Sequence, residues 1–177
     1  MNIKKGKTVS VITAALFTAL MAVFAQIPPS THEFPITLQT FGIALCGYIL
    51  GIKYSFFSII AYILLGAVGA PVFSGFCGGV HHITGPAGGF IIAFPIFVFF
   101  CAVSHKFKNK ILKISFGVLG LVVMYIVGIA YYVFVTKNPV SVAVLMYVLI
   151  FLKDIFFTVI AFFVSNILRK RIFNDKE

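Results

Sequence analysis

The sequence predicts an all-α integral membrane protein with six transmembrane helices. Hydrophobic residues make up 61% of the 177 residues, charged residues only 10%, and the mean hydropathy is +1.12. Soluble domains carry about 25% charged residues. Because a helix needs roughly 20 residues to cross a bilayer core of about 30 Å, six crossings leave only short connections. We therefore expect one transmembrane domain over residues 1–177, with no soluble domain.

Apolar runs separated by helix-ending residues mark the six spans. Pro28 and Pro29 end the first span and Pro71 ends the third, because proline lacks the amide donor of the helical ladder. Gly85 followed by Pro86 suits the start of the fourth. The first run also resembles a signal peptide, but it is long for one, and cleavage would leave the other spans unchanged. The predicted spans cover residues 9–26, 37–51, 54–70, 87–104, 111–135 and 148–168.

The distribution of positive charge orients these spans. Lysines and arginines lie before the first span, between the second and third, between the fourth and fifth, and after the sixth. The opposite loops at 27–36 and 71–85 contain neither residue, and the loop after the fifth span has only Lys137. This asymmetry predicts that both termini are cytoplasmic in a multi-pass protein of the cell membrane. The net charge of +10 then reflects orientation and attraction to the lipid bilayer, and no single basic face indicates nucleic-acid binding.

A glycine-rich outer loop is expected between the third and fourth helices, from Gly66 to Gly89. Irregular backbone at membrane depth persists only where it is buried in protein or lines a cavity, so we expect a pocket wall or lid. A flexible outer loop is the alternative. Gly88 and Gly89 begin the fourth helix, where free amides and the positive helix end suit a carboxylate or a polarised carbonyl. Close helix packing explains the same glycines equally well.

Small residues line one face of the first predicted helix. Ala15 and Ala19 are four residues apart, a spacing that lets another helix approach closely. That helix belongs either to this fold or to a partner subunit.

Lys153 and Asp154 are adjacent charges inside the sixth apolar stretch. An ionisable group in hydrocarbon costs roughly 2.5 to 3.5 kcal/mol, so its presence calls for a ligand, an ion path or a structural partner. Counting back about 20 residues from Arg169 places the outer boundary near Leu149, so the pair is expected one or two turns inside it. Adjacent helical residues do not face one another, so we expect two separate partners instead of a mutual salt bridge: an anionic solute for Lys153 and N–H donors for Asp154. Alternatively, Lys153 extends its ammonium group to the surface and Asp154 bonds within the bundle.

Enzyme, metal and cofactor sites are not predicted. His32, Glu33, His81 and His82 fall in outer loops, but their spacing does not match a helical metal-ligand pair. The three cysteines share no CxxC spacing, which argues against a zinc site. Residues 6–8 read GKT but lack the first glycine of a P-loop, so the chain is not expected to hydrolyse ATP. No catalytic triad is recognisable.

Three motifs in this order resemble the BioY family, the biotin-binding S components of energy-coupling factor (ECF) transporters. They are PITLQTF from Pro35, GAVGAPVFSGFCGG from Gly66 and GPAGGF from Gly85, and the resemblance extends from about Thr8 to Leu168. Residues 151–154 also resemble the family's signature in the sixth helix, where an aspartate follows an apolar lead-in.

Two positions depart from the family pattern. It usually reads GPTGGY, where this chain has Ala87 and Phe90 in place of the threonine and tyrosine. The family often has a lysine three residues after the aspartate, where this chain has Phe157. Lys153, directly before the aspartate, is therefore the candidate partner for a substrate carboxylate.

The resemblance implies a subunit that captures biotin in an outward-facing membrane pocket without covalent chemistry. Asp154 would accept the ureido N–H groups, and Gln39 would donate and accept hydrogen bonds. Backbone amides would contact the polar atoms, and aromatic rings would pack on the bicycle. The candidate binding residues are Asp154, Lys153, Gln39, Phe41, Tyr62, Phe73, Gly79, Gly88, Gly89 and Phe90.

The resemblance also implies partners: a transmembrane coupling subunit that contacts Ala15 and Ala19, and two ATPase subunits that supply energy. Two other functions are alternatives. One is a stand-alone secondary transporter of a small carboxylate, coupled to protons through Asp154, although the sequence has no internal repeat. The other is an intramembrane enzyme that uses His81, His82 and Asp154.

Overall fold

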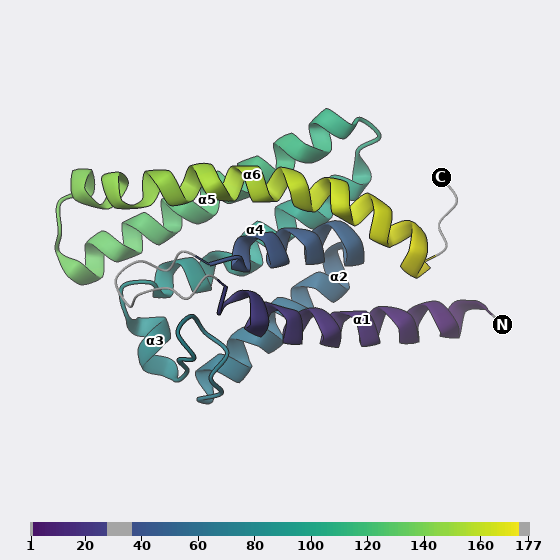
Figure 1. Ribbon diagram of the computed structural model, residues 1–177, viewed down its shortest axis with the longest axis horizontal. Coiled ribbons are helices and arrows are strands. Elements are labelled where there is room, and N and C mark those ends of the chain that lie inside the picture. The colour runs from purple at the N-terminus through teal and green to yellow at the C-terminus, as the bar shows by residue number, and fades with distance from the viewer. Residues whose placement is uncertain (1, 28–36, 174–177) are drawn as a thin grey trace.

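The computed structural model describes the backbone of residues 2–27 and 37–173, and these ranges are helical apart from one isolated β-bridge and the connections. Five helices are long and apolar enough to cross a membrane, which confirms the predicted all-α membrane class. The elements are α1 (Asn2–Phe24), α2 (Gln39–Ala67), α3 (Val80–Thr84), α4 (Gly88–Val103), the short 3-10 helix η1 (Ser104–Lys106), α5 (Lys110–Thr136) and α6 (Val140–Phe173) (Figure 1).

Helix α2 contains the second and third predicted spans, because it folds back on itself at Gly51. The backbone there has φ 70° and ψ −179°, outside the helical region. Gln39 Nε2 donates to the Tyr62 hydroxyl over 2.7 Å, whereas a straight helix would separate these residues by about 34 Å. Figure 1 shows the two halves running in opposite directions. Five long elements thus contain six helical segments; how many cross the bilayer, and where the termini lie, stay predictions.

The first half of α2 forms the centre of the bundle, since every residue from 42 to 50 is buried. It packs against α1, α4 and α6, and α5 covers α4 and α6. Two glycines allow close approach: a Cβ on Gly47 would lie 2.7 Å from Cys101 Cβ, and one on Gly117 would lie 1.8 Å from the Tyr48 hydroxyl. These contacts fix the position of the central segment relative to its neighbours.

Helix α6 begins earlier than its predicted span, at Val140 instead of 148. Lys137 makes the connection from α5 short, because its left-handed φ of 60° lets its amide donate to Val133 O over 2.9 Å. Lys153 lies about 20 Å along α6 from Val140. The depth of the pair below the membrane surface stays a prediction.

The glycine-rich segment between α2 and α3 folds tightly onto the end of α2. Positive φ angles at Gly69, Gly75 and Gly79 allow its sharp turns. Gly79 N donates to Gly66 O over 2.6 Å, closing the segment at its base. The ring of Phe73 fills the space beside Gly66, where a Cβ would lie 2.1 Å from the ring. Its 1% exposure makes Phe73 the buried anchor of this segment.

Candidate functional site

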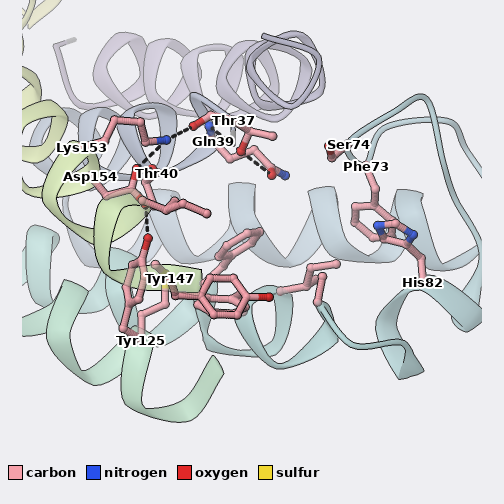
Figure 2. Close-up of a pocket in the computed structure, with 16 residues that line it drawn as sticks. Thr37, Gln39, Thr40, Phe73, Ser74, His82, Tyr125, Tyr147, Lys153 and Asp154 are labelled. Carbon is pink, nitrogen blue, oxygen red and sulfur yellow. Dashed lines mark hydrogen bonds and ion pairs between the residues drawn. The ribbon is translucent and has the colours of Figure 1, made fainter. Parts of the chain in front are cut away.

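A cavity of about 60 Å³ lies among α2, α4, α5, α6 and the glycine-rich segment (Figure 2). Its lining combines an ion pair, several hydroxyl and amide groups, and aromatic rings. The lining residues are Thr37, Gln39, Thr40, Phe73, Ser74, His82, Ala87, Phe90, Ile91, Phe94, Met124, Tyr125, Tyr147, Ile150, Lys153 and Asp154.

Lys153 and Asp154 form a direct salt bridge, with 2.8 Å between Lys153 Nζ and Asp154 Oδ1. The expectation of no mutual salt bridge was therefore wrong. It considered only the directions in which adjacent residues leave a helix, whereas the flexible four-carbon stem of lysine lets the ammonium group turn back. Lys153 also has a separate partner, since Nζ donates to the carbonyl of Thr37 over 2.5 Å.

Asp154 is only 3% exposed, and its carboxylate joins three helices. Thr40 on α2 donates to Oδ1 over 2.6 Å, and the Tyr125 hydroxyl on α5 donates to Oδ2 over 2.7 Å. Burying a charge is costly unless it is paired and hydrogen-bonded, and these donors together with Lys153 meet both conditions. The carboxylate is thus held in place before any ligand arrives.

A chain of hydrogen bonds, here called the relay, connects the ion pair to the glycine-rich segment. Beyond the contact of Lys153 with the Thr37 carbonyl, the Thr37 hydroxyl donates to Gln39 Oε1 over 3.0 Å. Gln39 Nε2 donates to the Tyr62 hydroxyl over 2.7 Å, which in turn donates to Val72 O over 2.8 Å. The relay thus connects Lys153 with the backbone beside Phe73.

The glycine-rich segment supplies one wall of the cavity. The Phe73 ring stacks on His82, with centroids 5.3 Å apart and planes inclined by 15°. Gln26, just after α1, holds this wall through both ends of its amide: Nε2 donates to Phe73 O over 2.9 Å, and Oε1 accepts from Phe76 N over 2.9 Å. Sequence reasoning missed Gln26, whose only signal is a polar side chain directly after the first apolar run.

The opposite wall is aromatic. Phe90 lies between Tyr125, at a centroid distance of 5.4 Å, and Tyr147, at 4.8 Å. Gly128 makes room for it, because a Cβ there would lie 2.4 Å from the Phe90 ring. The three rings line the cavity together with Asp154. Their faces and edges offer a surface on which an apolar ring system can pack.

The structure brings half of the predicted binding residues to the cavity. Lining residues among them are Asp154, Lys153, Gln39, Phe73 and Phe90. Tyr62 lies one hydrogen bond behind the wall, on Gln39. Phe41 lies elsewhere, with its ring 5.7 Å from Phe24 and 6.0 Å from Phe157.

The three predicted glycines do not line the cavity. A Cβ on Gly88 would lie 1.6 Å from Ile83 O, and one on Gly89 would lie 2.3 Å from Tyr131 Cβ, so both allow close packing. The amide of Gly88 already donates to Gly85 O over 2.9 Å, and that of Gly79 to Gly66 O. The packing alternative describes them better than the anion site.

Thr40 and Tyr125, the donors to Asp154, were not predicted. Thr40 lies within the PITLQTF motif, and Tyr125 is a polar group in the middle of an apolar span. Across the described residues, no three His, Cys, Asp or Glu side chains gather as a metal site, and His32 and Glu33 lie outside those residues. Ala15 and Ala19 are exposed on α1, away from the cavity.

Comparisons with known proteins identify the family of this chain. A family model described as the BioY family matches residues 1–174. The chain is 47% identical over 124 residues to a probable biotin transporter BioY of Pyrococcus horikoshii, covering 70% of this chain and 73% of that one. It is 36% identical to the biotin transporter BioY of Thermotoga maritima, covering 74% and 80%.

A crystal structure described as the S-component for biotin from an ECF-type ABC transporter has the same fold. The TM-score is 0.84 at 24% identity, and the match covers 96% of this chain and 94% of that chain. With the family model spanning nearly the whole sequence, the conclusion is direct: the chain belongs to the BioY family.

Proposed function

We propose that this chain is the substrate-capture subunit of an ATP-driven, ECF-type vitamin importer and binds biotin in the cavity beside Lys153 and Asp154. Family membership places it among multi-pass membrane transport proteins and not among enzymes. The names of its relatives support biotin as the ligand. The observation that carries the proposal is the buried ion pair, which faces a cavity walled by aromatic rings.

The chemistry of the lining suits each part of biotin. The ureido N–H groups are donors, and Asp154 offers a carboxylate that Thr40 and Tyr125 hold in position. The valerate carboxylate is an anion at the opposite end of biotin from the ureido group, and Lys153 is the lysine that lines the cavity. To bind it while Asp154 binds the ureido group, the ammonium group has to leave the salt bridge with Asp154. The apolar bicycle fits between Phe73 and Phe90, and Gln39 adds one donor and one acceptor.

Binding requires the cavity to enlarge. Its present volume of about 60 Å³ has room for a few water molecules, whereas ligand pockets measure roughly 300 to 1,000 Å³. The glycine-rich segment is the non-helical wall of the cavity, and Gln26 and Tyr62 hydrogen-bond to it. We infer that this segment moves outward to admit biotin. A ligand carboxylate that draws Lys153 Nζ away from the Thr37 carbonyl would break the first hydrogen bond of the relay.

Calorimetry of the detergent-purified chain with biotin tests the assignment. We expect Asp154→Asn to weaken binding by at least tenfold, about 1.4 kcal/mol, because an amide offers one acceptor and one donor group where the carboxylate is acceptor-only. Lys153→Gln should weaken binding of biotin much more than that of biotin amide, which lacks the carboxylate charge. Lys137→Gln is the matched control, an exposed lysine outside the cavity. No binding at micromolar biotin, with binding of another vitamin, would make the substrate wrong.

The proposed partners are a transmembrane coupling subunit and two ATPase subunits. The exposed small-residue face at Ala15 and Ala19 suits close contact with a partner helix. Ala15→Leu with Ala19→Leu should abolish co-purification with the coupling subunit and leave biotin affinity unchanged. Uptake that follows a pH gradient in proteoliposomes containing this chain alone would instead support a proton-coupled transporter.

A further inference from the structure

A second pocket, of about 260 Å³, lies where α2 reverses direction. Arg169 lines it, about 22 Å along α6 from Asp154. The start of α1 and the end of α6 lie at this same end of the bundle (Figure 1). The pocket has an apolar floor, made by Ile49, Leu50, Ile52 and Ala102, and a basic rim, made by His105, Lys106 and Arg169.

The rim is built on the turn at Gly51. Gly51 leaves the helical conformation, and His105 lies beside this turn. His105 Nε2 lies 3.3 Å from Gly47 O, and Arg169 Nη1 contacts His105 Nδ1. Through this contact His105 holds the guanidinium group of Arg169 beside the pocket that both residues line.

Charge at this end is strongly unbalanced. Among the described residues the one carboxylate is Asp154, which is buried in the first cavity with Lys153. Lys106 is exposed at the rim. Further basic residues follow the lining residues closely in the sequence: Lys53, Lys108, Lys110, Lys113, Lys170 and Arg171. Within the described part of the chain, this end thus presents basic side chains and no carboxylate, which suits an anionic ligand.

We propose that this pocket binds the phosphate group of an anionic membrane phospholipid. Guanidinium and ammonium groups are the usual ligands of phosphate oxygens. The apolar floor directly beneath the rim matches the glycerol and first acyl carbons of a lipid, which a free phosphate ion would leave unused. Basic pockets between helix ends at the membrane surface bind lipid headgroups in this manner.

Native mass spectrometry of the full chain in mixed micelles tests the site, with phosphatidylglycerol and phosphatidylcholine of identical acyl chains as probes. We expect Lys106→Gln with Arg169→Gln to reduce retained phosphatidylglycerol by at least roughly tenfold, because each substitution removes a charge-assisted contact with the lipid phosphate. Phosphatidylcholine retention should not change. Lys108→Gln with Lys110→Gln is the matched control: the same charge is removed from exposed residues outside the pocket, and retention should stay near that of the unmodified chain.

Folding is monitored separately, because Arg169 also orients His105. Lys106→Gln alone should lower phosphatidylglycerol retention in the same direction while biotin calorimetry is unchanged. Equal losses in the pocket and control variants would overturn the site in favour of diffuse charge. Displacement of the lipid by inorganic phosphate at equal concentration would overturn the lipid as the source of the phosphate. Loss of coupling-subunit binding with unchanged lipid retention would assign the pocket to a protein partner instead.

Discussion

The two ends of the contact between α2 and α6 treat charge in opposite ways. At the cavity end, Thr40 and Lys153 both contact Asp154, so the carboxylate is satisfied by the chain's own groups. At the other end, Arg169 and Lys106 border an open pocket without a carboxylate in its lining. The difference follows from burial: a charge in the bundle needs partners from the chain, whereas water solvates a charge at the surface. The buried carboxylate therefore has its partners before a ligand arrives, whereas the exposed Lys106 stays in contact with solvent.

The largest expected effect is the loss of Asp154. Asp154→Ala should lower the free energy of unfolding by about 3 to 5 kcal/mol, the cost of removing one partner from a buried ion pair. The variant leaves Lys153 without its anion and removes the acceptor of Thr40 and Tyr125. Denaturant unfolding in detergent measures it, with Arg169→Gln as the comparison at the open end. An equal or larger loss for Arg169→Gln would contradict the contrast between the two ends.

Gly51→Ala tests the reversal of α2. The combination φ 70° and ψ −179° is almost restricted to glycine, so we expect a cost of about 1 to 3 kcal/mol. The nearest atom to an added Cβ would be His105 Cδ2 at 3.9 Å, so the cost is conformational and not steric. Biotin affinity should stay unchanged if the two ends are independent. Thermal unfolding with calorimetry checks both; a stable variant would show that this backbone conformation is not strained for alanine.

The smallest effect is expected from breaking the relay. Tyr62→Phe removes the hydroxyl that accepts from Gln39 and donates to Val72 O, at about 1 kcal/mol for a typical hydrogen bond. We expect faster amide hydrogen exchange in residues 68–79, with the Asp154 end of α6 unaffected. Tyr131→Phe is the control, because that hydroxyl makes only longer contacts, of 3.4 Å to Ile83 O and 3.3 Å to Thr84 O. Unchanged exchange in residues 68–79 would mean that other contacts hold the segment.

Features that depend on local sequence were largely predictable. Apolar runs located the long helices, and the gap between two predicted spans fell at the reversal beside Gly51. Lys153 and Asp154 stood out because charges are rare in apolar segments. Phe73 and Phe90 were named from the family motifs and line the cavity.

Features that depend on contacts between distant segments were not predictable. Tyr125 reaches Asp154 from another helix, and nothing near either residue indicates the pair. The salt bridge depends on the lysine side-chain conformation, which residue spacing does not determine. From the sequence, Gly88 and Gly89 fitted an anion site and a packing surface equally well. Only the contacts of Ile83 and Tyr131 with these glycines distinguish the two.

The reversal at Gly51 also bears on how the protein is made. The segment from 39 to 50 is only about 18 Å long, well short of a hydrocarbon core of about 30 Å. It is surrounded by protein and not by lipid. Such a helix is too short to be retained in the bilayer alone, so we expect residues 39–67 to enter the membrane together, as a preformed pair, during biosynthesis. Thr40, which donates to the Asp154 carboxylate, would then reach its final depth in the membrane only after the ribosome has released the second half of α2.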